Sequence, residues 1–166
     1  MIHASYGKDT IYGGFGEDLL SFDQMTGPLG VVVNLLTNKV SFADNAGMTF
    51  SQIEDLQGSA YADSLTGSNG NNILMGGAGA DSLYGLAGND TLIGGAQGDW
   101  LDGGAGADVF VFVAVSDSAA ATGLDTISGF QPNVDVINLA AIDAVPGGGG
   151  RRYYLHRHSG LHRSGA

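Results

Sequence analysis

The sequence predicts an all-β fold, a right-handed parallel β-roll (a β-solenoid) of Gly-rich nonapeptide repeats with a short C-terminal strand region. Three observations predict this fold. An acid or its amide recurs at every ninth position, a large apolar residue follows two positions later, and glycines precede it in the same phase. The polar positions are Asp63, Asn72, Asp81, Asp90, Asp99 and Asp108, and the apolar positions are Leu65, Leu74, Leu83, Leu92, Leu101 and Phe110. Units this short cannot bury an apolar side chain alone, so stacked neighbours must share one core.

Each nonapeptide is predicted to fold as a tight turn of six residues followed by a strand of three. Glycine suits the turn because it adopts positive φ without steric cost. Side chains alternate along a strand, so the large apolar residue points inward and its two neighbours point outward. Two units make one coil of 18 residues, and residues 18 positions apart therefore lie above one another on the same edge.

The first part of the chain, residues 1–57, is predicted to form N-terminal coils of the roll with two weak repeats. Asp9 and Asp18 occupy the acid position of these repeats, but no acid follows either of them 18 residues later. Residues 22–57 lose the nine-residue phase, and within them residues 30–42 are rich in Val and Leu, which predicts a strand. Residues 51–57 are predicted to form another short extended segment.

The six regular repeats occupy residues 58–111, and the C-terminal flanking strands are predicted within residues 112–146 and at the end of the last repeat. The predicted strands cover residues 109–115, which we expect to be buried, and residues 125–130 and 135–142. The last part, residues 147–166, is predicted to be a disordered tail. Its abrupt switch to Arg and His after four glycines suggests a frameshift near the end of the coding sequence.

Acidic residues dominate the body of the chain. Residues 1–150 hold all 17 acids and only two lysines, which gives this part a formal charge of −15. Such a body does not bind nucleic acid or an anionic membrane surface by charge, and it repels itself unless cations neutralise it. Fifteen of the acids are Asp, a short oxygen ligand, and the chain has no Cys. Bound cations are therefore expected to stabilise the fold in place of disulfides.

The stacked turns predict a calcium centre. Carboxylates stacked at roughly 5 Å repel one another, and a dication between them reverses the sign of the interaction. Ca²⁺ takes about six to eight oxygen ligands at about 2.3–2.6 Å, whereas the smaller Mg²⁺ requires a stricter octahedral geometry. The predicted metal ligands are Asp63, Asn72, Gly76, Gly77, Gly79, Asp81, Gly85, Gly88, Asp90, Gly94, Gly95, Asp99, Gly103, Gly104, Gly106 and Asp108.

The acids are predicted to act in stacked pairs, one from each of two successive coils. The pairs are residues 63 and 81, 81 and 99, 72 and 90, and 90 and 108. The pairs 81/99 and 90/108 are expected to bind best, because Ala60 and Tyr61 replace glycines in the first turn and Asn72 lacks a charge. Gln97 replaces a turn glycine in the unit of Asp99 and is expected to strain it.

The nonapeptides resemble the RTX parallel β-roll. Together with residues 51–57 and 125–144, they resemble the C-terminal domain of serralysin-type secreted metalloproteases. Similar modules occur in alginate epimerases and haemolysin-like toxins. The resemblance implies a domain that binds calcium, folds outside the cell and carries a C-terminal signal for type I secretion. It places Asp81, Asp90, Asp99 and Asp108 at the ligand position.

The resemblance does not extend to catalysis, because the zinc motif H-E-x-x-H is absent and the sequence therefore predicts a non-catalytic module. Expected partners are calcium ions, an upstream catalytic domain, and a type I exporter if the secretion signal survives. No nucleic acid and no membrane span are expected. The expected function is calcium-dependent folding of a secreted, extracellular module. The alternatives are a fragment of a larger secreted metalloprotease or alginate epimerase, or a surface adhesion module.

Overall fold

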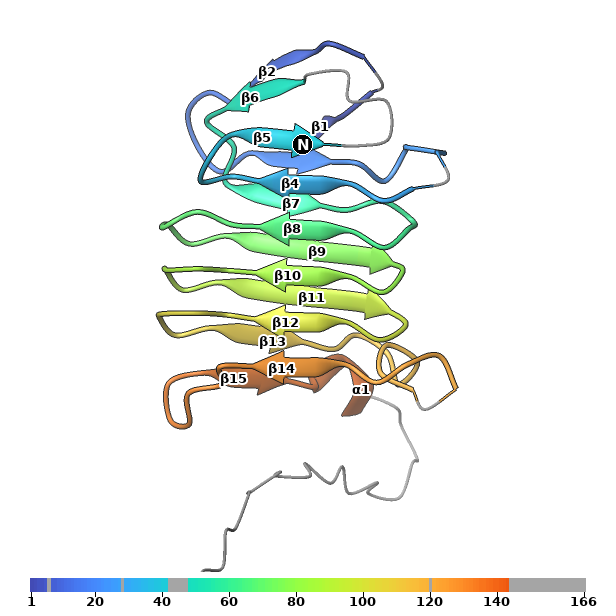
Figure 1. Cartoon of the computed structure of the whole chain (residues 1–166). Helices are drawn as coiled ribbons and strands as arrows, with labels where there is room; N and C mark the ends of the chain where they lie inside the picture. The colour runs from blue at the N-terminus through green and yellow to red at the C-terminus, as the bar shows by residue number, and fades with distance from the viewer. Residues whose placement is uncertain (6, 28, 42–47, 120, 144–166) are drawn as a thin grey trace, which may run out of the picture.

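The computed structural model describes residues 1–5, 7–27, 29–41, 48–119 and 121–143. The predicted tail and its suggested frameshift lie outside these residues. Within them the chain forms short strands and one helix of four residues, α1 (Ala140–Asp143). Figure 1 shows coils stacked along one axis, from β1 and β2 near the N-terminus to β14, β15 and α1 at the opposite end. The predicted all-β roll is confirmed.

Two sheets form the two sides of the roll, and successive repeats alternate between them. In spatial order, the seven-stranded sheet contains β1 (Ile2–His3), β3 (Leu19–Ser21), β7 (Asp55–Gln57), β9 (Ile73–Ala78), β11 (Thr91–Ala96), β13 (Val109–Val111) and β15 (Val136–Asn138). The eight-stranded sheet contains β14 (Thr126–Ser128), β12 (Trp100–Asp102), β10 (Ser82–Tyr84), β8 (Ser64–Thr66), β4 (Val32–Asn34), β5 (Lys39–Ser41), β6 (Thr49–Ser51) and β2 (Thr10–Tyr12). Neighbours in the seven-stranded sheet are parallel, as the stacking of coils requires.

The core is a column of apolar side chains between the two sheets. The apolar repeat residues pair in register as Leu65, Leu83 and Leu101 in one sheet and as Leu74, Leu92 and Phe110 in the other. All six are fully buried. Trp100, the neighbour of Leu101 along the strand, points outward and is 43% exposed. The alternation of the strand therefore sends one side chain of each repeat into a shared core, as predicted.

The segment 30–42 is not the single strand that we predicted. It contains β4 and β5, which pair antiparallel, and β5 also pairs antiparallel with β6. A polar turn reverses the chain, because Thr37 donates its N–H to the Asn34 side chain (2.9 Å) and Asn38 has a φ of +53°. This hairpin adds strands to one sheet only. In the other sheet β3 stacks directly on β7, although their paired residues lie 36 positions apart.

The predicted buried strand at 109–115 ends early. β13 stops at Val111, and beyond it Val113 and Val115 are exposed. Asp117 accepts the backbone N–H groups of Val113 and Ala114, both at 2.8 Å, and these bonds turn the chain away from the sheet. The prediction was wrong here because it followed the apolar run to residue 115. The backbone pairing with the next coil, which defines the strand, ends earlier.

The last predicted strand, residues 135–142, divides into β15 and the helix α1. The Asn138 side chain accepts the N–H of Ala140 (3.0 Å), and this cap begins the helix where the strand ends. A helix of four residues is too short for its 3.6-residue period to appear in the sequence.

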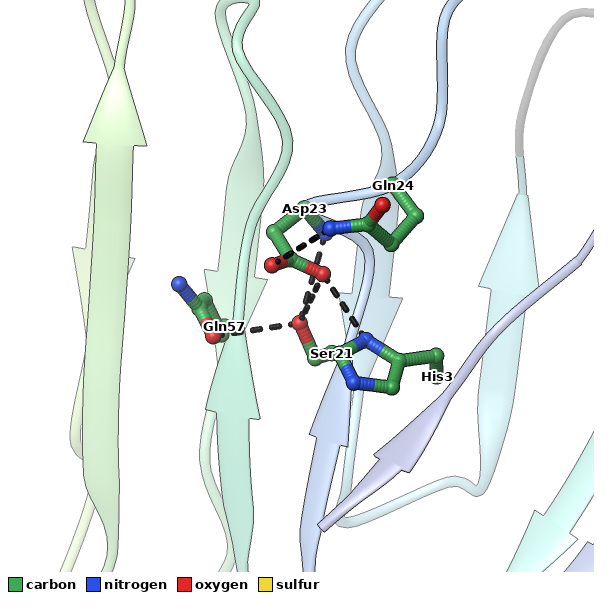
Figure 2. A network of polar contacts seen from close by, with 5 residues as sticks. All are labelled: His3, Ser21, Asp23, Gln24 and Gln57. Carbon is green, nitrogen blue, oxygen red and sulfur yellow. Dashed lines mark hydrogen bonds and ion pairs between the residues drawn. The ribbon is translucent and has the colours of Figure 1, made fainter.

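A polar network joins the first strands of the seven-stranded sheet (Figure 2). The buried hydroxyl of Ser21 on β3 lies 2.8 Å from Asp23 Oδ1 and 3.1 Å from the Gln57 side chain on β7. His3 on β1 lies 2.9 Å from the same Asp23 oxygen, and Gln24 donates to the other one at 3.1 Å. The Ser21 hydroxyl above all, then Gln24 and His3, lowers the pKa of Asp23. The charged carboxylate therefore connects β1 to β3 and, through Ser21, to β7.

We predict that Leu92→Ala lowers the free energy of unfolding of the calcium-loaded protein by about 2–5 kcal/mol, because it leaves a cavity between the two sheets. The matched control is Thr91→Ala, which truncates the outward neighbour and should change stability by less than about 1 kcal/mol. Urea unfolding followed by circular dichroism measures both. Equal losses in the two variants would contradict the placement of the core.

Candidate metal centre

The polar repeat residues form two columns, one along each edge of the roll. In each column the backbone N–H of one residue donates to the Oδ1 atom of the residue one coil further on. The bonds run from Asp63 to Asp81 (2.8 Å), Asp81 to Asp99 (2.8 Å), Asn72 to Asp90 (2.8 Å) and Asp90 to Asp108 (2.9 Å). The structure therefore brings together all four pairs that the period predicts.

Each column continues beyond the last repeat. Asp99 donates its N–H to Asp125 (2.9 Å), and Asp108 donates its N–H to Asp135 (3.1 Å). These steps span 26 and 27 residues, so a search at the 18-residue period misses them. A signal was nevertheless present, because Asp125 and Asp135 each stand two positions before an isoleucine that pairs with the apolar column.

Each of four buried aspartates has one oxygen without a partner. Asp81, Asp90, Asp99 and Asp108 are at most 3% exposed, and their Oδ1 atoms accept the backbone bonds between coils. The Oδ2 atom of each is buried and has no hydrogen-bond partner. A buried carboxylate oxygen without a partner is strongly destabilising. A cation beside these oxygens would remove that penalty.

Glycines let the backbone lie close to each Oδ2 atom, where a Cβ atom would not fit. A Cβ atom on Gly76 would collide with Asp81 Oδ2 and lie 2.5 Å from the Gly94 carbonyl oxygen. A Cβ atom on Gly85 would likewise collide with Asp90 Oδ2 and lie 2.5 Å from the Gly103 carbonyl oxygen. Carboxylate and carbonyl oxygens thus converge between successive turns, and these are the ligands that Ca²⁺ prefers.

In the turns of Asp99 and Asp108, a glycine likewise lies directly against the Oδ2 atom. A Cβ atom on Gly94 would collide with Asp99 Oδ2, and one on Gly103 with Asp108 Oδ2. Among the described residues, no cluster of three or more His, Cys, Asp or Glu side chains has the spacing of a metal site. The sequence predicts that backbone carbonyls complete the coordination shell, and the carbonyl oxygens of Gly94 and Gly103 lie in the adjacent turns.

The other predicted glycines adopt the left-handed backbone of the turns. The glycines with positive φ in these four units are Gly77, Gly79, Gly88, Gly95, Gly104 and Gly106. Two residues with side chains share this conformation, namely Leu86 with a φ of +78° and Gln97 with a φ of +85°. Side chains are disfavoured there. The expected strain at Gln97 is therefore present, and the strain at Leu86 is a further finding.

Asp63 and Asn72 lie in the same columns but have different surroundings. Asp63 Oδ2 accepts the N–H of Ser59 (2.6 Å), and its Oδ1 atom accepts the Ser59 hydroxyl (2.9 Å) and the N–H of Val31 (2.6 Å). Asn72 Oδ1 accepts the N–H of Ser68 (2.7 Å), in addition to the bond that links Asn72 to Asp90. In these two turns the protein itself satisfies the oxygens that a metal would use.

The two weak repeats near the N-terminus also differ from each other. Asp9 accepts the Ser5 hydroxyl at 2.7 Å. Asp18 Oδ2 is buried without a partner, and the Asp18 N–H donates to the Glu54 side chain at 3.0 Å. The acid that stacks on Asp18 thus exists, but it lies 36 positions away because the β4–β5 hairpin intervenes in the sequence.

Burial raises the pKa of the carboxyl groups in both columns. Burial above all, with the charges of Asp63 and Asp99, raises the pKa of Asp81 to about 7. The same cause raises the pKa of Asp90 and of Asp99 to about 6 and that of Asp125 to about 7. The pKa of Asp63 and that of Asp108 are also raised, again mainly by burial. The charged columns therefore oppose folding unless a proton or a cation neutralises them.

We predict that the metal-free protein is more stable at about pH 5 than at about pH 8. Carboxyls with a raised pKa in the folded state bind protons on folding, so stability is gained at low pH and lost as the pH rises through about 6 to 7. The β signal in far-UV circular dichroism, recorded in EDTA at both pH values, measures the difference. The variant Asp81→Asn/Asp125→Asn should lose much of it, and a weaker β signal at pH 5 than at pH 8 would contradict the prediction.

The family model of the RTX calcium-binding nonapeptide repeat (4 copies) matches residues 1–24, 50–83 and 75–110, which together make just over half of the chain. A comparison with curated proteins gives no match. Among the described residues, no helix has the length and apolar character needed to cross a membrane. The stacked aspartates, the glycine turns beside them and this match lead to one conclusion: the chain belongs to the RTX calcium-binding nonapeptide repeat family, and the metal that it binds is Ca²⁺.

Proposed function

We propose that this chain is a secreted, non-catalytic module whose folding is controlled by calcium. The observation that carries the proposal is the set of four buried Oδ2 atoms without partners, at Asp81, Asp90, Asp99 and Asp108. A fold that buries such oxygens in charged form depends on a cation. Calcium-dependent folding is therefore the function that these turns support best.

The ions are proposed to lie between successive turns. The carboxylates of Asp81, Asp90, Asp99 and Asp108 would hold them together with carbonyl oxygens of the glycine turns, among them Gly94 and Gly103. When bound, Ca²⁺ supplies positive charge where the two columns accumulate negative charge. Glycine is needed at these positions as well, because a Cβ atom at Gly76 or Gly85 would collide with the carboxylate.

Calcium would act on this chain as a folding switch. The body with its formal charge of −15 repels itself without cations, and each ion that binds only the folded state adds RT ln(1 + [Ca²⁺]/Kd) to stability. This term is roughly 2.7 kcal/mol at a hundredfold excess over Kd. Extracellular calcium modules have a Kd of about 10⁻⁴ to 10⁻³ M. The chain would then stay unfolded in a calcium-poor cell and fold outside it.

The resemblance to serralysin-type C-terminal domains supports the secreted setting. Such domains pass through a type I exporter, and an unfolded, acidic chain suits that passage. The same resemblance makes an upstream catalytic domain a proposed partner. In that arrangement the roll has no activity of its own and accompanies a larger secreted metalloprotease or alginate epimerase.

We predict that calcium added to the EDTA-treated full chain produces a coil-to-β transition in far-UV circular dichroism at about 0.1–1 mM. The buried carboxylates need a dication with flexible coordination, so Mg²⁺ at the same concentration should not produce the transition. Full β signal in EDTA at neutral pH, or an equal response to Mg²⁺, would contradict calcium-controlled folding.

A further inference from the structure

The turns of the six repeats fall into two classes according to the residue that lies four positions before the turn acid or amide. We call a turn open when the acid's Oδ2 atom is buried without a partner. In the repeats, the open turns are those of Asp81, Asp90, Asp99 and Asp108. The residues four positions before these acids are Gly77, Leu86, Gly95 and Gly104, with φ values of +110°, +78°, +107° and +90°.

We call a turn closed when the backbone N–H four positions before the acid or amide donates to its side-chain oxygen. Closed turns occur at Asp63 and Asn72, through Ser59 (2.6 Å) and Ser68 (2.7 Å). They occur again beyond the repeats, at Asp117 through Val113 (2.8 Å) and at Asp135 through Gln131 (2.7 Å). None of these four donors is among the described residues that have positive φ.

In turns of both classes, a glycine and a carbonyl oxygen from the next coil lie beside the acid or amide. In the closed turn of Asp63, a Cβ atom on Gly58 would collide with Asp63 Oδ2 and with the Gly76 carbonyl oxygen, as in the open turns. The closed turn of Asn72 is likewise lined by Gly67 and the Gly85 carbonyl oxygen. The closed turns therefore differ from the open ones in the backbone four positions earlier. A negative φ there aims the N–H at the acid, whereas a positive φ leaves the acid without that donor.

We propose that the conformation of the residue four positions before the acid selects which turns bind calcium. The open turns of Asp81, Asp90, Asp99 and Asp108 take the ions. The closed turns of Asp63 and Asn72 take none, because Ser59 and Ser68 already occupy their oxygens. The inference rests on calcium binding by this family, and it removes Asp63 and Asn72 from the ligands expected from the nine-residue period.

Leu86 gives independent support. A leucine is disfavoured at a φ of +78°, and such strain persists where it serves a site. A backbone with negative φ at this position would relieve the strain and close the turn of Asp90, yet Asp90 Oδ2 is left buried without a partner. The turn keeps the conformation that a cation requires.

The turn of Asp18 belongs to the open class as well. Gly14, four positions earlier, has a φ of +107°, and Asp18 Oδ2 is buried without a partner. We assign no ion to it, because the residue is partly exposed and faces Glu54 where the repeats have an aspartate or its amide.

The first test compares Asp81→Asn with Asp63→Asn in the full chain, using calcium stoichiometry from isothermal titration calorimetry. Asn at position 81 keeps the oxygen that accepts the Asp63 N–H, whereas Asn at position 63 replaces one acceptor oxygen of Asp63 by an amide donor. Far-UV circular dichroism in excess calcium therefore first establishes that both variants fold. Asp81→Asn should lose at least one bound ion relative to the wild type, and Asp63→Asn should lose none. Equal losses would overturn the selection rule and leave calcium-controlled folding intact.

The second test uses one position and two substitutions. Leu86→Ser should close the turn of Asp90 and lower the number of bound ions by one, and it should stabilise the protein in EDTA. Leu86→Gly removes the same side chain but tolerates positive φ, so it should keep every ion and bind at least as tightly as the wild type. Identical calcium stoichiometry in the two variants would overturn the rule, because the loss of the leucine is common to both.

Discussion

The structure depends on how each stacked aspartate uses its two oxygens. One oxygen accepts a backbone N–H from the neighbouring coil and so takes part in holding the coils together. In the open turns the other oxygen is buried without a partner. The same carboxylate that joins two coils thus carries a charge that the protein does not neutralise. The proposed calcium-dependent folding follows from this double use of each carboxylate, because a cation at the second oxygen would favour the stacking made by the first.

The apolar column and the carboxylate columns depend on each other through the strand that lies between them. Each Asp stands two residues before a fully buried Leu or Phe, so an ion that fixes the turn also fixes the register of the strand that follows. Closed turns at Asp63 and Asn72 hold their strands with protein donors alone. The roll therefore joins two turns that protein donors satisfy, those of Asp63 and Asn72, to the following four turns, whose Oδ2 atoms have no protein partner.

The nine-residue period was sufficient to predict the roll, its core and the pairing of the columns, because one strict spacing fixes them all. The period alone could not distinguish Asp63 from Asp81; the missing glycines at Ala60 and Tyr61 predicted a weaker first pair, but the difference in the structure lies in the backbone at Ser59 and Gly77. It also missed Asp125 and Asp135, which join the columns across irregular loops. The hairpin of β4 and β5 was missed for the same reason, because a non-periodic segment has several pairings that its composition does not separate.

Crystals of the full chain grown in calcium and measured for anomalous scattering would test the central claim most directly, since the signal locates each ion without reference to folding or affinity. The account predicts anomalous peaks beside the Oδ2 atoms of Asp81, Asp90, Asp99 and Asp108, and none beside Asp63 and Asn72. A roll with those four oxygens bonded only to water or to protein groups, and no peak beside them, would contradict it.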